Sequence, residues 1–149
     1  MQYKLKTYSK KLLADTITPV NIYLKLRDVY AGSILLESSD YHGHVNSLSF
    51  ICCEPIASFQ VADDVAESHY PDGQFKSETI TKVGQVTSMF ESFRSAFTPD
   101  VIVSKYVNCG LFGYMAYDSI RYFEDVSITK KENLIPDILY KLYRYVIIV

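Results

Sequence analysis

The spacing of apolar positions divides the chain into predicted strands and helices. Residues 2–8 alternate between apolar and polar side chains, which predicts a first strand. A helix is predicted to begin at Thr18-Pro19, because Thr18 can cap it and Pro19 fits its first position. The side chains expected to form its buried face are Val20, Tyr23, Leu24 and Leu26.

The next predicted strand carries two polar side chains at its end. Its apolar run from Ile34 to Leu36 would be anchored in a core and would deliver Glu37 and Ser38 to a rim or pocket. Such a rim suits an amino-acid ligand, because a carboxylate balances an ammonium group and a hydroxyl donates or accepts a hydrogen bond. The alternative is a solvated turn, since most exposed polar residues bind nothing.

The middle of the chain predicts two strands and a hairpin. The strands are expected at residues 47–53 and 57–61, separated by Glu54-Pro55. The sequence His69–Gly73 predicts a turn, because proline presets one central position and glycine accepts a positive φ.

A change of period at Thr81 predicts a second helix, of about four turns and capped by Thr81. Its apolar stripe is expected to be core and comprises Val83, Val86, Met89, Phe90, Phe93, Ala96 and Phe97.

Glycines and charges mark the region before the last strand. Gly110 and Gly113 are expected to allow close backbone approach within a sheet. Asp118, Arg121 and Glu124 lie one helical turn apart, which predicts ordinary ion pairing on a surface helix.

Together these elements predict an α+β fold, with a mainly antiparallel sheet and two or three packed helices. A chain of 149 residues fits one domain, 1–149. Residues 138–149 form an apolar and aromatic run, so we expect the last strand, 140–149, to belong to something longer.

The composition of the chain excludes some classes of binding partner. The net charge of −2 offers no basic field, so neither nucleic acid nor an anionic membrane is expected as a partner. No apolar run approaches the roughly 20 residues that span a bilayer, and no targeting signal is visible. Three cysteines, two of them adjacent (Cys52-Cys53), make a poor disulfide framework and favour a reducing cytoplasm.

The remaining motifs do not predict chemistry. No metal site is expected from His42-Gly43-His44 with Cys52-Cys53, because adjacent strand residues point to opposite faces and zinc-ligand spacing is missing. Gly110–Gly113 lacks dinucleotide-binding spacing, and no nucleophile-base pairing can be assembled.

Several blocks in order resemble the N-terminal region of anthranilate synthase component I, within the chorismate-utilising enzymes. These blocks are Thr18–Arg27, Leu35-Leu36-Glu37-Ser38, Ser49-Phe50-Ile51 with Glu54-Pro55, Gly110–Glu124 with its Arg-Tyr-Phe-Glu ending, and Pro136-Asp137.

The resemblance implies an activity of a longer parent. That family converts chorismate and ammonia, supplied by a glutamine amidotransferase partner, to anthranilate and pyruvate with Mg²⁺. Its catalytic region is expected to be absent here, so we assign no catalytic residue and no cofactor to these 149 residues, and expect them alone to be inactive.

The resemblance also implies part of the site at which L-tryptophan, the pathway product, exerts feedback inhibition. That role is carried onto Leu35, Leu36, Glu37 and Ser38, and charge pairing assigns the ligand's ammonium to Glu37. Ser49 is a weaker candidate, because Ser47-Leu48 stand where many members have a basic-aromatic pair.

Two alternatives stay open. Aminodeoxychorismate synthase component I shares the fold and the chorismate chemistry. The chain could instead be a structural and interaction domain that packs on its own catalytic domain; its exposed apolar surface would then promote dimerisation.

Overall fold

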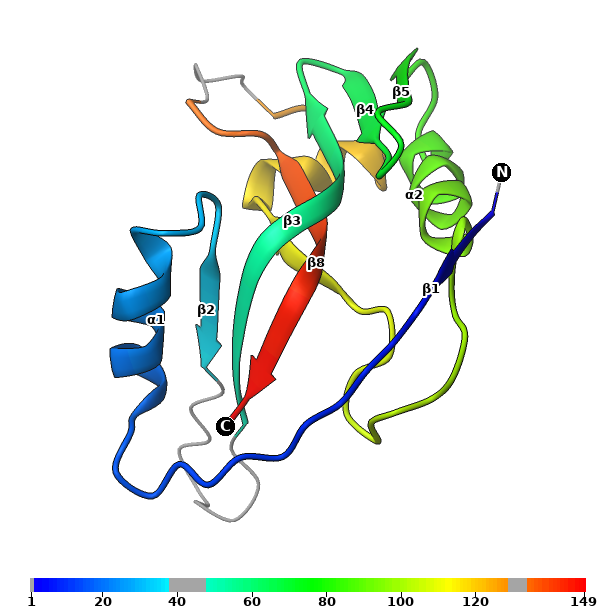
Figure 1. Cartoon of the computed structure of the whole chain (residues 1–149). Helices are drawn as coiled ribbons and strands as arrows, with labels where there is room; N and C mark the ends of the chain where they lie inside the picture. The colour runs from blue at the N-terminus through cyan, green and yellow to red at the C-terminus, as the bar shows by residue number, and fades with distance from the viewer. Residues whose placement is uncertain (1, 38–47, 129–133) are drawn as a thin grey trace. The chain divides into compact units, whose positions relative to one another are not determined.

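The chain is described by a computed structural model for residues 2–37, 48–128 and 134–149. Its contacts form two compact units, Met1–Ser9 with Ala57–Leu142 and Lys10–Ile56 with Tyr143–Val149. In chain order (Figure 1) the elements are β1 (Tyr3–Leu5), α1 (Pro19–Arg27), β2 (Ile34–Glu37), β3 (Ser49–Ala62), β4 (Val65–His69), β5 (Phe75–Thr79), α2 (Gln85–Ser95), β6 (Phe97–Pro99), β7 (Leu111–Met115), the 3-10 helix η1 (Tyr117–Tyr122) and β8 (Ile138–Ile148).

Pairing between these strands is mostly antiparallel. In the first unit the strand order is β5-β4-β3-β8-β7, and a short parallel pair joins β1 to β6. In the second unit β2 pairs with β3. The predicted α+β class with a mainly antiparallel sheet is confirmed.

Tight turns close the hairpins of the first unit. Asp63 and Asp64 both have positive φ, 50° and 61°, and connect β3 to β4 in two residues. Between β4 and β5 the Gly73 N–H donates to the Tyr70 carbonyl, and Gly73 has φ 84°. The predicted turn at 69–73 is therefore confirmed.

The start of α1 follows its sequence signal. The Thr18 side chain accepts a hydrogen bond from the Asn21 N–H at 3.2 Å, and Pro19 takes the first helical position. The predicted buried face is wrong for Val20 and Leu24, which are 44% and 46% exposed. The half-buried stripe is instead Ile22, Tyr23 and Leu26, since α1 packs along β2 (Figure 1) and only one narrow stripe meets it.

Strand β3 corrects the prediction of two strands at 47–53 and 57–61. It continues through Glu54-Pro55, where Glu54 adopts φ 58°. Arg144 from β8 lies against this position, with its Nε 3.0 Å from Glu54 Oε1. Pro55 removes only one N–H donor from the hydrogen bonds between strands. Pairing of the residues before and after Pro55 keeps the strand continuous.

Helix α2 also begins elsewhere than predicted. Its N-terminal cap is Gly84 with φ 79°, and no side chain caps it. Thr81 lies outside the helix, where its N–H donates to the Gln85 side chain. Phe97 belongs to β6 rather than to the helix, so the predicted four turns are shortened at both ends.

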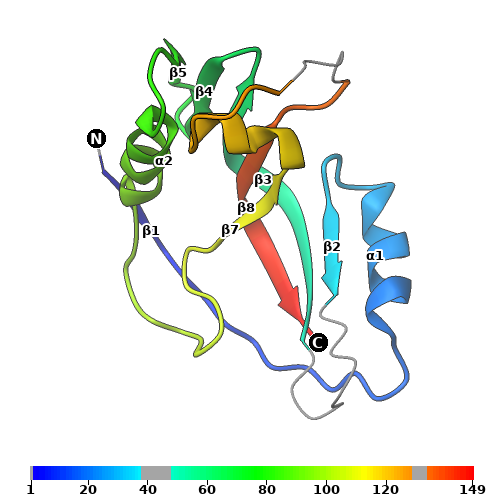
Figure 2. The same ribbon diagram turned by 180° about the vertical axis from the view of Figure 1, so that it is seen from behind.

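The aromatic core of the first unit forms where α2 packs on β4 (Figure 2). Phe59 and Phe93 are fully buried, with ring centroids 5.8 Å apart, and Phe90 meets Phe59 edge-on at 5.3 Å. The expectation that this stripe is core is confirmed for Val86, Phe93, Ala96 and Phe97 and wrong for Val83, which is 55% exposed; Met89 and Phe90 are half-buried.

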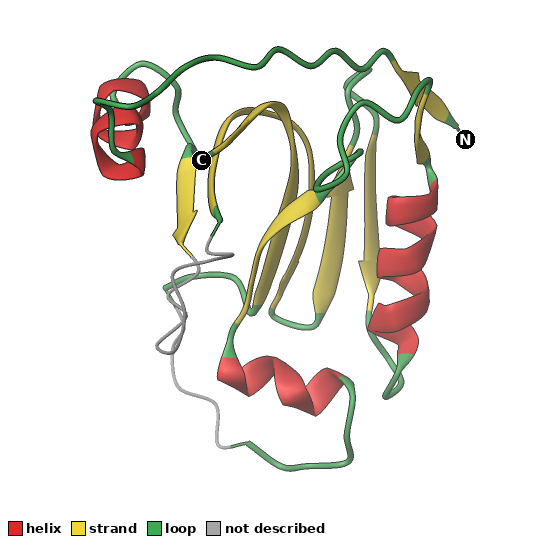
Figure 3. Cartoon of the chain, turned by 90° about the horizontal axis from the view of Figure 1, so that it is seen from below, coloured by secondary structure: helices red, strands yellow, loops and turns green. Residues whose placement is uncertain are grey.

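Strand β1 extends this cluster. The Tyr3 ring stacks on Tyr70 and Phe97 at 5.6 Å and 5.5 Å, and its hydroxyl donates to Asp72 Oδ2 at 2.9 Å. After β1, residues 6–18 form neither helix nor strand and run as a loop (Figure 3).

Candidate functional site

The predicted ligand residues lie mainly where β2 pairs with β3 in the second unit. Leu35 is opposite Ile51, Leu36 is opposite Phe50, and Glu37 is opposite Ser49. Ser38 lies outside the described residues.

The backbone hydrogen bonds between β3 and the residue after β8 determine which kind of cross-strand pair Glu37 and Ser49 form. Ser49 exchanges both backbone bonds with Val149, at 2.9 Å and 3.0 Å. Its N–H and carbonyl therefore point away from β2, so Glu37 and Ser49 form a non-hydrogen-bonded pair. In such pairs the Cα atoms lie about 4.5 Å apart and the side chains are close.

The pleat sorts the predicted residues onto two faces. Paired strand residues share a face and residues two apart share it as well, so Glu37, Ser49, Leu35 and Ile51 lie together. Leu36 lies on the opposite face with Phe50. The structure thus brings together three of the predicted residues, Leu35, Glu37 and Ser49, and separates Leu36 from them.

The side chains on this face differ in burial, so the apolar ones form a floor and the polar ones form a rim. Ile51 is fully buried and Leu35 is half-buried. Glu37 is exposed and Ser49 is half-buried. An apolar floor with a carboxylate and a hydroxyl at one end can bind a small amphiphile that carries an ammonium group.

The connection from α1 to β2 is tied to β8 within the same unit. The Tyr143 hydroxyl donates to the Gly32 carbonyl at 3.1 Å, and the Tyr30 and Tyr145 rings lie 6.4 Å apart. Burial, and to a lesser extent Cys52, raises the pKa of Tyr143. Gly32 has φ 77°, so its turn favours glycine.

A second polar cluster, in the first unit, centres on Arg121. Its Nη2 donates to Asp137 Oδ2 at 2.7 Å and to the Tyr122 hydroxyl at 2.8 Å. The Tyr122 hydroxyl in turn donates to Asp137 Oδ2 at 2.9 Å. Asp137 is 3% exposed and the Arg121 side chain 17%, so this ion pair is largely buried.

This cluster corrects the prediction of surface pairing among Asp118, Arg121 and Glu124. The segment is a 3-10 helix, and Arg121 turns inward to Asp137 and, more distantly, to Asp64, with 3.8 Å between Nε and Oδ1. Burial of Arg121 acts to lower its pKa, but Tyr122 and Asp137 outweigh it and raise the pKa. The spacing of charges within 118–124 could not show that the partner of Arg121 is Asp137. The one sequence signal for this partner was the position of Asp137 directly before an apolar strand.

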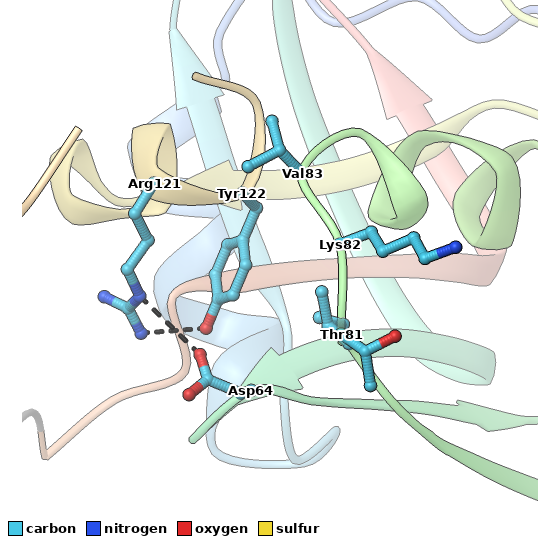
Figure 4. A pocket seen from close by; sticks show the side chains of 7 residues that line it. Asp64, Thr81, Lys82, Val83, Arg121 and Tyr122 are labelled. Atoms are coloured by element: carbon cyan, nitrogen blue, oxygen red, sulfur yellow. Dashed lines mark hydrogen bonds and ion pairs between the residues drawn. The ribbon is translucent and has the colours of Figure 1, made fainter. Parts of the chain in front are cut away.

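A shallow hollow of about 200 Å³ adjoins Arg121. Figure 4 shows Lys82 and Thr81 pointing away from the guanidinium, while Asp64 faces it. The lining residues are Asp64, Ile80, Thr81, Lys82, Val83, Arg121 and Tyr122. Because two carboxylates already neutralise Arg121, this cluster fixes η1 against β8 rather than presenting a free charge.

No group of three or more His, Cys, Asp or Glu in the described ranges could hold a metal ion. His42 and His44, weighed above as ligands, fall outside those ranges. Cys52 and Cys53 are buried, and burial raises the pKa of the Cys52 thiol to about 12. No helix within 2–37, 48–128 and 134–149 is long and apolar enough to cross a membrane.

Three curated relatives match nearly the whole chain. The proteins from Thermus thermophilus and Aquifex aeolicus are each 28% identical, covering 92% and 89% of this chain. The protein from Lactococcus lactis is 25% identical and covers 93%. All are named anthranilate synthase component 1.

The chain is similar to anthranilate synthase component 1. The resemblance inferred from the sequence blocks is confirmed by these relatives. The chain spans only 28%, 26% and 29% of their respective lengths. No family model matches it.

Proposed function

We propose that this chain is the N-terminal regulatory region of an anthranilate synthase component I and carries part of a tryptophan feedback site. Three relatives of that name, each similar over about nine-tenths of the chain, support the family part of this proposal. The site part rests on one observation, the pairing of Glu37 with Ser49 across β2 and β3.

The face that carries Glu37 suits the chemistry of tryptophan. The Glu37 carboxylate would balance the ammonium group, and the Ser49 hydroxyl would serve a second polar atom of the ligand. Leu35 would hold part of the indole. Ser38 belongs to the proposed site by sequence, and Leu36 would support it from the other face.

Feedback would work through differential binding. Tryptophan would favour the arrangement of the parent that binds chorismate poorly, and chorismate would weaken tryptophan by the same factor. In the parent, chorismate and ammonia from a glutamine amidotransferase would give anthranilate and pyruvate. As the resemblance implies, Mg²⁺ and catalysis would belong to the rest of the parent. The proposed location is the cytoplasm.

Titration with tryptophan tests the proposal. The chain has 13 Tyr and no Trp, so indole fluorescence reports the ligand alone, and calorimetry measures the same binding. We expect saturable binding that Glu37→Ala weakens by about 10- to 100-fold, as loss of a charged hydrogen bond implies. Glu124→Ala, at an exposed glutamate outside this face, should bind as the original chain does.

The outcomes separate the parts of the proposal. Binding that is unchanged in Glu37→Ala would overturn the role of Glu37. If the original chain does not bind tryptophan, these 149 residues alone do not form a sufficient site. If a full-length parent with the Glu37→Ala substitution is still inhibited by tryptophan, the proposed site is wrong altogether.

A further inference from the structure

The face that carries Glu37 offers a ligand one negative charge. Glu37 and Ser49 form a cross-strand pair, and Leu35 and Ile51 lie behind them on the same face. Of these side chains the Glu37 carboxylate is charged, the Ser49 hydroxyl is neutral and the other two are apolar. Their charge attracts a cation and repels an anion.

The sequence around this face contains neither lysine nor arginine. The stretch from Asp28 to Phe75 lacks both, and it includes β2, β3, β4 and all residues between Glu37 and Ser49. The 3 histidines of the chain all lie in this stretch, and an ordinary histidine is mostly neutral at about pH 7.5. At that pH the stretch therefore contributes negative charge and almost no positive charge.

The arginines of the second unit already have acidic partners. Arg27 Nε lies 3.3 Å from Asp28 Oδ1, and Arg144 Nε lies 3.0 Å from Glu54 Oε1. The lysines of this unit are exposed, where solvent and salt screen their charge: Lys10, Lys11 and Lys25. An anion on the Glu37 face would gain little from either kind of residue.

An α-amino acid brings both of its charges to this face. Its ammonium and carboxylate groups are bonded to one carbon, so an ammonium that reaches Glu37 brings the ligand carboxylate to within about 5 Å of the Glu37 carboxylate. Two negative charges at that distance repel each other even in water. The carboxylate of an amino acid therefore weakens its own binding here.

We propose that this face selects an arylalkylamine, which has an ammonium group and no carboxylate, over the corresponding amino acid. This inference rests on the proposed function, because it concerns the same site and an indole ligand. The Glu37 carboxylate attracts the ammonium group of both ligands and repels the carboxylate that only the amino acid carries. Leu35 holds part of the aromatic ring of either ligand.

Three indole ligands of different charge test the selectivity. Tryptamine carries the ammonium group alone, tryptophan carries both charges, and indole-3-propionate carries the carboxylate alone. The chain has no Trp, so indole fluorescence reports each ligand, and calorimetry measures each affinity. At about pH 7.5 and low salt, we expect tryptamine to bind about 3- to 10-fold more tightly than tryptophan, and indole-3-propionate to bind least.

Glu37→Gln tests whether Glu37 causes this selectivity. Glutamine keeps the size of the side chain and removes its charge, and the position is exposed, so the fold should not change. In this variant tryptamine should lose its advantage over tryptophan, and indole-3-propionate should bind more tightly than it does to the original chain. Glu124→Gln, at an exposed glutamate outside this face, should keep the original selectivity.

The outcomes distinguish this inference from the proposed function. Tryptophan that binds at least as tightly as tryptamine would overturn the selectivity and leave the tryptophan site standing. Tryptamine binding without tryptophan binding would support the selectivity and contradict tryptophan as a ligand of these residues alone. Selectivity that Glu37→Gln leaves unchanged would overturn the role of Glu37, and no binding of any of the three ligands would overturn both proposals for this chain.

Discussion

Gly113 of β7 lies against the backbone of Leu139 in β8. A Cβ atom at residue 113 would be 1.8 Å from the Leu139 carbonyl oxygen. No side chain fits at that distance, and the obstacle is backbone within a paired strand. The prediction that this glycine serves close backbone approach is thus confirmed.

Gly113→Ala should therefore destabilise the chain strongly. We expect a loss of about 3 kcal/mol or more, since β7 must move away from β8. Urea unfolding followed by circular dichroism measures it. Gly110→Ala, where the nearest atoms belong to the Val107 and Phe112 side chains, should cost clearly less; equal losses would contradict this account.

Asp137→Ala should destabilise the chain strongly, because it breaks a largely buried ion pair. It leaves Arg121 largely buried without its main partner and removes the acceptor of the Tyr122 hydroxyl. Breaking such a buried pair costs about 3–5 kcal/mol. Chemical denaturation measures it.

The matched control is Glu91→Ala, which removes the exposed pair between Glu91 and Arg94. Both side chains are more than half exposed, so solvent screens their attraction and the expected loss of stability is small. If Asp137→Ala cost no more than this control, the Arg121 cluster would have no structural role.

Tyr3 should titrate late and in dependence on Asp72. Partial burial and the hydrogen bond to Asp72 raise the pKa of Tyr3 to about 12. Because the folded pKa exceeds the unfolded value of about 10, this contribution to stability is complete below pH 10 and is lost as pH rises through 12. In Asp72→Asn the pKa of Tyr3 should fall but remain above 10. NMR titration of the labelled tyrosine ring measures both values; an unchanged pKa in Asp72→Asn would refute the link.

Two threonines that look alike in sequence should differ in effect. Thr18→Ala removes the observed cap of α1 and should cost about 1 kcal/mol. Thr81→Ala leaves the cap of α2 intact, since Gly84 occupies that position, and should cost at most half as much. Thermal unfolding of both variants compares them, and equal losses would mean that Thr81 also caps.

The candidate site shows where sequence reasoning reached its limit. The apolar run Ile34–Leu36 predicted a strand with Glu37 and Ser38 at its end, and the structure confirms the strand over Ile34–Glu37. The alternation of a strand already puts Leu36 on the opposite face from Leu35 and Glu37, but it could not tell that Glu37 faces Ser49. Register depends on which strand lies beside which, and that is a long-range property.

The sequence by itself determined the elements whose causes are local. Thr18-Pro19 specified the start of α1, and Pro71-Asp72-Gly73 specified the turn between β4 and β5, because caps and turns depend on a few adjacent residues. Tertiary structure alone decided that β3 passes unbroken through Glu54-Pro55, since pairing on both sides outweighs a local break. It also decided that Arg121 finds Asp137 sixteen positions away, because only folding brings those two charges out of water together.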